Sequence, residues 1–310
     1  MRVIPGIIET GAAVVSLWRA AATTDTDFEG TVCMANLLLL LKALILGIVE
    51  GITEFLPISS TGHMILVGAF MGTDSGPYAK FFTLFEIVIQ FGAILAVVVL
   101  FRKRILDVFR NFKPGQYGLR LALAIIASLV PTVIVAVLFY KKIGKLLMYP
   151  LPVALSLVVG GIALIYFERA FGHKGKVRRM EDVGIKEGFM VGVFQCLSFL
   201  WPGFSRSAST IIGGWVVGLT TVAAADYTFF LAIPTMFGAS AYSLLDAKMK
   251  LSGIEVAALV LGFVVAFIVA LIVVKKFIGF LKKKPLRVFG YYRIAVGIVM
   301  LICVAAGVLH

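Results

Sequence analysis

The chain has 310 residues, of which 61% are hydrophobic and only 15% are charged, and its formal net charge is +13. This composition excludes an ordinary water-soluble domain and is typical of a polytopic α-helical membrane protein. The basic residues cluster in short segments between apolar runs, which indicates positive-inside bias and not a nucleic-acid partner. The three cysteines are too scattered to form a metal site or a disulfide framework.

Residues 1–36 differ in pattern from the rest of the chain. They are mildly apolar at first, with Glu9 and Arg19 interrupting, and become polar and acidic from Thr23. Arg19 argues against a cleaved signal peptide, because it breaks the apolar stretch. We therefore expect either a poorly ordered extension or a non-native one that is translated from an upstream start, in which case Met34 is the natural first residue.

An apolar stretch that is broken near its middle occupies 37–72. Its first arm carries Glu50 and Glu54, and the break begins at Pro57. Neither arm reaches the roughly 20 residues of a comfortable membrane span. Non-helical backbone at membrane depth is tolerated only where it lines protein or a wet cavity. The pattern therefore predicts a re-entrant helical hairpin.

The same order, a broken hairpin and three full spans, occurs twice. The first unit is expected at 37–168, with spans at 79–101, 118–140 and 151–168; a basic cytoplasmic loop follows at 169–187; the second unit is expected at 188–310, with a hairpin at 188–219 and spans at 225–246, 254–274 and 288–308. Three full spans are an odd number, so the second unit must be inverted relative to the first. The predicted fold is an all-α integral membrane protein with an inverted-topology repeat.

Direct comparison of the two units supports this repeat. At an offset of 145, Pro57 falls on Pro202 and Ser60 falls on Ser205. Further on, 91–93 matches 237–239 after a slip of one residue. We therefore expect Ser60 and Ser205 to be equivalent and to contact the ligand.

Charge in the connecting segments predicts the orientation. Segments 102–117, 169–187 and 275–287 hold five, six and six basic residues, whereas the opposite loops hold five in all. The basic segments should be cytoplasmic. The first hairpin then enters from outside and the second from the cytoplasm, and their breaks should meet near mid-membrane.

The second break is dense in hydroxyl groups and holds one guanidinium in uncharged surroundings. An arginine at membrane depth costs from about 2.5 to above 10 kcal/mol, so Arg206 needs an anion, a water-filled cavity or both. Pro202 and Gly203 interrupt any helix, and a new helix starting near Ser205 would offer free N–H groups beside Arg206. The predicted anion contacts are Gly203, Ser205, Arg206, Ser207 and Thr210.

Glu50 and Glu54 lie four residues apart, so they share one face of a helix. Two carboxylates in an apolar arm repel each other and need a cation or a shared proton between them. Mg²⁺ or Ca²⁺ takes carboxylate oxygens and bridges to phosphate. The alternative is a purely structural pairing with Arg206, and we expect a metal or catalytic role.

His63 lies six residues after Pro57, beside the hydroxyl groups of Ser59, Ser60 and Thr61. A lone histidine is usually structural, but the repeat should bring this one near Arg206 and the glutamates. We expect it to transfer a proton or to act as a nucleophile. The three hydroxyls either cap a helix or bind phosphate, and one geometry serves both.

Two motifs carry a resemblance to a known family. The first is Glu50-Gly51-Ile52-Thr53-Glu54-Phe55-Leu56-Pro57 followed by Ser59-Ser60-Thr61-Gly62-His63, and the second is Pro202-Gly203-Phe204-Ser205-Arg206-Ser207 with Thr210. They resemble the undecaprenyl-diphosphate phosphatase family of the bacitracin-resistance type over roughly 37–308. Ala208 stands where that family often has glycine.

The resemblance implies a hydrolase of the bacterial cell membrane that removes the terminal phosphate of undecaprenyl diphosphate, a polyprenyl diphosphate lipid, for reuse in cell-wall synthesis. It also implies a divalent metal, Mg²⁺ or Ca²⁺, on Glu50 and Glu54, and a site open to the outer face. The implied catalytic residues are Glu50, Glu54, Ser60, His63 and Arg206, and the implied substrate contacts are Ser59, Thr61, Gly203, Ser205, Arg206, Ser207 and Thr210. The nucleophile is left open among His63, Ser60 and water, and a homodimer is compatible with this interpretation.

Inverted repeats with facing hairpins are also a transporter architecture. The alternative function is therefore a carrier for an anionic solute or a flippase for a polyprenyl phosphate. A transporter would use Arg206 but has less need of Glu50, Glu54 and His63 together. Release of phosphate from a diphosphate lipid distinguishes the two.

Overall fold

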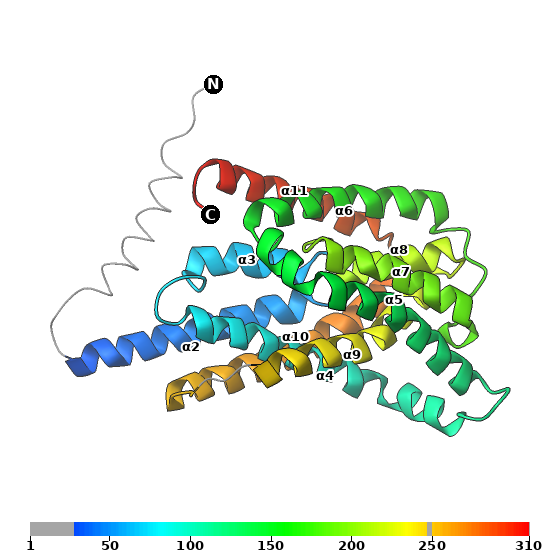
Figure 1. Ribbon diagram of the computed structural model, residues 1–310, viewed down its shortest axis with the longest axis horizontal. Helices are drawn as coiled ribbons and strands as arrows, with labels where there is room; N and C mark the ends of the chain where they lie inside the picture. The colour runs from blue at the N-terminus through cyan, green and yellow to red at the C-terminus, as the bar shows by residue number, and fades with distance from the viewer. Residues whose placement is uncertain (1–27, 247–249, 310) are drawn as a thin grey trace.

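The computed structural model describes residues 28–246 and 250–309, and this part of the chain is a bundle of helices. The elements are α2 (Phe28–Thr53), α3 (Ser60–Met71), α4 (Ala79–Arg110), α5 (Tyr117–Leu146), α6 (Pro150–Phe171), the 3₁₀ helix η1 (Met180–Asp182), α7 (Ile185–Leu200), α8 (Arg206–Val216), α9 (Thr221–Asp246), α10 (Gly253–Leu281) and α11 (Arg287–Ala305). Figure 1 shows most of them lying side by side along the long axis of the molecule.

Seven of the described helices are long and apolar enough to cross a membrane: α2, α4, α5, α6, α9, α10 and α11. Helices α4, α5, α6, α9, α10 and α11 coincide with the six predicted spans. A helix satisfies every backbone group within the segment, which is why apolar runs of this length take that form in lipid. The prediction of an all-α integral membrane protein is confirmed.

The first arm of the first hairpin is longer than we predicted. Helix α2 begins at Phe28, and 33–53 within it is itself long enough for a span. Our statement that neither arm reaches that length is wrong for this arm. The helix continues through 28–36, a stretch without proline that we had assigned to the N-terminal extension. Residues 1–27 of that extension lie outside the described residues.

The first helix of each predicted unit packs against a helix of the other unit. Helix α2 packs along α10, and α7 packs along α5. Both contacts depend on glycine: a Cβ on Gly47 would lie 2.8 Å from the carbonyl oxygen of Gly262 in α10, and one on Gly192 would collide with the backbone of Ser128 in α5. Gly47 and Gly192 are 145 residues apart, so this reciprocal packing supports the repeat. The inversion itself stays a prediction.

Both breaks end in a serine with unusual backbone geometry. Ser59 caps α3 and Ser205 caps α8, with φ of 71° and 75°. They are the two non-glycine residues with positive φ in the part of the chain that the structure describes. Each side chain accepts a hydrogen bond from the backbone N–H three residues later, at Gly62 and Ala208. Such strain is uncommon and clusters at functional sites.

This geometry corrects the register of the repeat. Ser59, and not Ser60, occupies the same structural position as Ser205. The loop from Pro202 to Ser205 is one residue longer than the loop from Pro57 to Ser59. Our pairing of Ser60 with Ser205 is therefore wrong, because the one-residue slip occurs already inside the break.

The three basic segments meet at one end of the bundle. Arg104 near the end of α4 contacts Asp226 of α9 at 2.7 Å and Glu181 of η1 at 3.0 Å. Buried Glu168, near the end of α6, accepts hydrogen bonds from the backbone N–H of Leu286 and of the next residue at the start of α11. A carboxylate at that position stabilises a helix N-terminus. Segments that are far apart in sequence thus form one charged layer.

Candidate active site

The N-termini of α3 and α8 border the same cavity, which has a volume of about 210 Å³. The lining residues are Glu54, Ser59, Ser60, Thr61, Gln90, Ser198, Phe199, Gly203, Ser205, Arg206, Thr235, Met236 and Ala239. The first backbone N–H groups of a helix have no partner within it and carry the positive end of the helix dipole. Two such ends at one cavity make it attractive to an anion. The structure therefore brings the two predicted breaks together.

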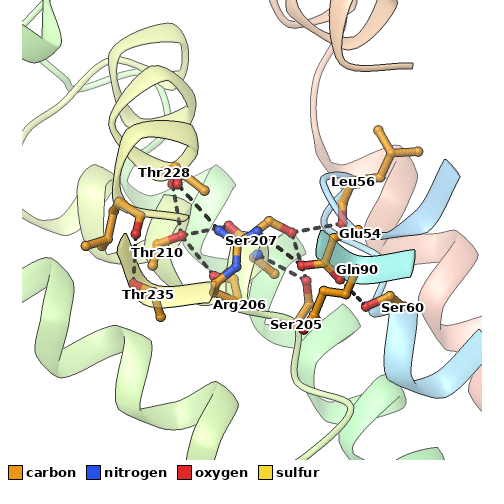
Figure 2. Close-up of polar contacts among 12 residues, drawn as sticks. Glu54, Leu56, Ser60, Gln90, Ser205, Arg206, Ser207, Thr210, Thr228 and Thr235 are labelled. Carbon is orange, nitrogen blue, oxygen red and sulfur yellow. Dashed lines mark hydrogen bonds and ion pairs between the residues drawn. The ribbon is translucent and has the colours of Figure 1, made fainter. Parts of the chain in front are cut away.

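Glu54 connects the two breaks. Its Oε2 accepts a hydrogen bond from Ser60 Oγ at 2.5 Å, and its Oε1 accepts one from Arg206 Nη2 at 3.4 Å. Figure 2 shows these three side chains converging, with Ser205 beside them. The side chains of Arg206 and Glu54 are 11% and 6% exposed. This is a hydroxyl, a carboxylate and a guanidinium in one chain of contacts, largely withdrawn from water.

Arg206 keeps free donor capacity. Its Nη1 donates to the carbonyl oxygen of Thr228 at 3.4 Å, and the guanidinium lies 5.8 Å from the ring centroid of Phe55. Its buried Nε has no hydrogen-bond partner among the described residues. A guanidinium can make five hydrogen bonds, so an oxyanion in the cavity would find donors available.

Ser207 and Thr210 hold the start of α8 in place. Ser207 Oγ contacts Ser205 Oγ at 3.0 Å and donates to the carbonyl oxygen of Leu56, in the first break, at 2.8 Å. Thr210 Oγ1 donates to the carbonyl oxygen of Arg206 at 2.9 Å. Neither residue is among those that line the cavity. In this conformation both orient the site from behind, and their predicted contact with substrate stays a prediction.

Glu50 lies one helical turn before Glu54 and is 3% exposed. Its Oε1 has no partner among the described residues, and it does not line the cavity. A buried carboxylate oxygen without a donor, next to a second carboxylate, fits a divalent cation, since Mg²⁺ binds through one or two carboxylates plus water and phosphate oxygens. Within the described ranges, no three His, Cys, Asp or Glu side chains are arranged so that they could hold a metal ion by themselves. Water and substrate oxygens would have to complete such a site.

His63 has both ring nitrogens engaged. Nδ1 lies 2.7 Å from the carbonyl oxygen of Ser59, and Nε2 lies 2.8 Å from the hydroxyl of Tyr292. A carbonyl only accepts, so Nδ1 carries the proton and Nε2 accepts from Tyr292. The two rings also stack, with centroids 5.6 Å apart. His63 is not among the residues that line the cavity with Arg206.

Our sequence analysis missed Tyr292 and Arg293. Arg293 is completely buried and donates to the carbonyl oxygens of Pro57 and Gly203, one in each break. A signal was present, because Arg293 is the charged residue inside the predicted span 288–308. The cost of an arginine at membrane depth applied to it as much as to Arg206.

Comparison with known proteins agrees with the motifs. The family model described as bacitracin resistance protein BacA matches residues 43–299. The chain is 48% identical over 267 residues to the undecaprenyl-diphosphatase of Clostridium tetani, covering 86% of this chain and 97% of the relative. It is 49% identical over 278 residues to that of Clostridium novyi, covering 87% and 97%. With that of Thermoanaerobacter sp. strain X514 it shares 48% over 267 residues, covering 86% and 97%.

Proposed function

The chain belongs to the family of the bacitracin resistance protein BacA, and from this premise we infer that it is an undecaprenyl-diphosphatase. It is a multi-pass protein of the bacterial plasma membrane that hydrolyses undecaprenyl diphosphate to undecaprenyl phosphate and inorganic phosphate. This reaction returns the lipid carrier to cell-wall synthesis. The observation that carries the inference is the cavity at which two helix N-termini, Arg206 and the Glu54–Ser60 pair converge.

The diphosphate head is bound by donors from both breaks. Backbone N–H groups at the starts of α3 and α8 face the phosphate oxygens, and Arg206 adds a guanidinium with unused donors. Phosphoryl transfer needs mostly positioning and neutralisation of charge, and fixed donors at low exposure supply both. Ser59, Thr61, Gly203 and Ser205 line the same cavity and complete the set of contacts.

Ser60 is the nucleophile that the geometry supports best. Its hydroxyl lines the cavity and already donates to Glu54 Oε2 at 2.5 Å. Ser60 Oγ attacks the terminal phosphorus, its proton passes to Glu54, and the bond from phosphorus to the bridging oxygen breaks, so that undecaprenyl phosphate leaves. Water then hydrolyses the phosphoserine and restores the hydroxyl. His63, held between Ser59 and Tyr292, acts by fixing the start of α3.

Glu50 and Glu54 would hold a divalent cation, Mg²⁺ or Ca²⁺. Two observations support this assignment: Glu50 Oε1 has no partner among the described residues, and the Glu54 N–H donates to the Glu50 carbonyl at 3.0 Å, which places the two residues one helical turn apart. When bound, the cation neutralises charge on the diphosphate. Without it, two buried carboxylates would repel each other and the anionic substrate.

The cavity opens toward the outer face of the membrane. Helix α7 begins at Ile185, beside the basic end, and Ser198 and Phe199 near its other end line the cavity. If the basic end is cytoplasmic, the cavity lies displaced toward the outer leaflet. A homodimer stays a prediction, since no feature of the described residues bears on it.

The test is phosphate release by the purified protein. Undecaprenyl diphosphate in detergent with Mg²⁺ should yield phosphate and undecaprenyl phosphate in equal amounts. Substrate labelled at the terminal phosphate, quenched in acid, should leave label on Ser60 and none in Ser60→Ala. An active enzyme that never carries label would exclude the phosphoserine. No phosphate release at all would favour the transporter alternative.

A further inference from the structure

Helix α11 places a cation between the two breaks. The Arg293 side chain is fully buried, and its donors are directed at backbone carbonyl oxygens. Nη1 donates to Pro57 at 3.3 Å, Nη2 to Gly203 at 3.1 Å and to Ser156 at 3.4 Å, and Nε to Leu157 at 3.5 Å. None of the ion pairs among the described residues includes Arg293. Its partners are therefore the backbone of α6 and of both breaks.

The two break carbonyls occupy equivalent positions. Pro57 lies two residues before the cap Ser59, and Gly203 lies two residues before the cap Ser205. Both caps have positive φ, a conformation that persists only where the surroundings hold it. One guanidinium thus binds both strained loops at equivalent positions, two residues before the cap serine of each helix.

The neighbouring helix α6 leaves room for this guanidinium. A Cβ built on Gly160 would collide with Arg293 Nη2 and lie 2.9 Å from Cζ. The aromatic ring of Phe204, inside the second break, lies 5.8 Å from the guanidinium carbon. Glycine at 160 and an arginine at 293 form a fitted pair, so the position of the charge is specified by packing as well as by hydrogen bonds.

We propose that Arg293 is a positioning residue for the phosphatase reaction: it joins the carbonyls of Pro57 and Gly203 and so sets the separation of Ser60 from Arg206. This inference rests on the proposed function. Ser60 begins α3 and Arg206 begins α8, and each follows its cap directly. An error of about 1 Å between nucleophile and substrate can cost on the order of 100-fold in rate. Arg293 does not touch the substrate and acts through the two loops.

The first experiment compares Arg293→Lys with Arg293→Met in the purified full-length protein. Lysine keeps a charge and three donors, so it can still hold two carbonyls, whereas methionine of similar length holds none. We expect kcat to fall about 100-fold for methionine and about 10-fold for lysine, with KM within about threefold of wild type. The unfolding midpoint in detergent is measured alongside, so that kcat is expressed per folded molecule. A packing role predicts the reverse order, because methionine fits an apolar interior better than lysine.

Two glycine variants keep the test valid if Arg293→Met fails to fold. Gly160→Ala retains the arginine but pushes its guanidinium aside, and kcat should fall at least about tenfold. Gly290→Ala is the matched control, because its Cβ would meet Ile165 and the Gly161 carbonyl at the same α6–α11 interface without touching the guanidinium. Its kcat should stay within about threefold of wild type.

The outcomes separate this inference from the proposed function. Equal kcat for Gly160→Ala and Gly290→Ala, or a methionine variant more active than the lysine variant, overturns the positioning role while wild-type turnover stands. A wild-type protein without turnover instead refutes the phosphatase function.

Discussion

Arg206 and Arg293 have different surroundings and therefore different roles. Arg206 contacts Glu54 at 3.4 Å and still has an Nε without a partner. Arg293 directs its donors at four backbone carbonyls of the fold. Spare donors can bind an anion, whereas the Arg293 guanidinium makes its four hydrogen bonds to the backbone and so holds structure. At the scale of single residues, one arginine thus serves the reaction and another arginine serves the structure that supports it.

Replacing Arg206 should abolish most activity without unfolding the protein. Arg206→Ala removes a guanidinium that faces the phosphate, and loss of one preorganised donor costs on the order of 100- to 1,000-fold in rate. Arg206→Lys keeps the positive charge but lacks the paired N–H donors of the planar guanidinium, so it should retain only part of the activity. Phosphate release measures both. Size-exclusion profiles and helical circular dichroism serve as controls, and wild-type turnover in Arg206→Ala would refute the assignment.

Glu50 and Glu54 should differ in their response to metal. Glu50→Gln weakens a cation site but leaves the acceptor for the Ser60 proton, so high Mg²⁺ should restore most of kcat. Glu54→Gln removes that acceptor, and general-base loss costs on the order of 100-fold or more at any Mg²⁺ concentration. Activity titrated with Mg²⁺ distinguishes them. Identical curves for the two variants would show that the carboxylates share one role.

At the scale of elements, the site depends on how α3 and α8 begin. Each starts after a serine with positive φ, whose side chain accepts a backbone N–H three residues on. The cap supplies one acceptor and leaves the remaining first-turn N–H groups for the ligand. In each loop, the cap serine thus both adopts the strained backbone conformation and leaves the first-turn N–H groups of its helix available.

Substitution at Ser205 can separate strain from chemistry. Ser205→Gly relieves the positive φ of 75° and costs little as a cap, whereas Ser205→Ala keeps the strain and loses the cap. We expect the glycine variant to be more stable than the alanine variant by about 1 kcal/mol. Unfolding in detergent with increasing denaturant measures this. Both variants should lose activity, because both lack the hydroxyl. A more stable alanine variant would contradict the argument.

At the scale of the whole molecule, the basic connecting segments lie at one end of the bundle, away from the candidate active site. The basic segments converge through Arg104, Glu181 and Asp226 at one end. Burial alone would raise the pKa of Glu181, but hydrogen bonds from its own backbone and from Arg104, together with the charge of Arg104, hold that pKa below its usual range. The Glu181 carboxylate therefore stays charged at neutral pH, and its contribution to stability is lost only as the solution is acidified through that lowered pKa.

Labelling of introduced cysteines should show which end faces outward. In a background with the three native cysteines replaced, Ser75→Cys lies in the exposed loop between α3 and α4, and Gln116→Cys lies in the exposed loop between α4 and α5. A membrane-impermeant maleimide should label position 75 in intact cells and position 116 only after permeabilisation. As a control, both variants should hydrolyse the substrate equally well. The reverse labelling pattern would show that the orientation in the membrane is opposite to the predicted one.

The sequence by itself determined the membrane class, the spans and the motifs. Apolar length decides whether a helix crosses lipid, and six predicted spans coincide with observed helices because that signal is local. The cost of a buried charge likewise identified Arg206, Glu50 and Glu54. The start of α2 at Phe28 was missed, because helix ends depend on weak local preferences.

Only the tertiary structure decided how these parts meet. Arg293 and Pro57 are 236 residues apart, and His63 and Tyr292 are 229 apart, so no local pattern joins them. The correspondence of Ser59 with Ser205 depends on loop dihedrals that an offset comparison cannot detect. Hydrogen bonds between distant segments form only when the helices pack, and packing is a property of the whole chain. That is why the predicted residues were largely found at the breaks, while the arginine that holds the breaks together was not predicted.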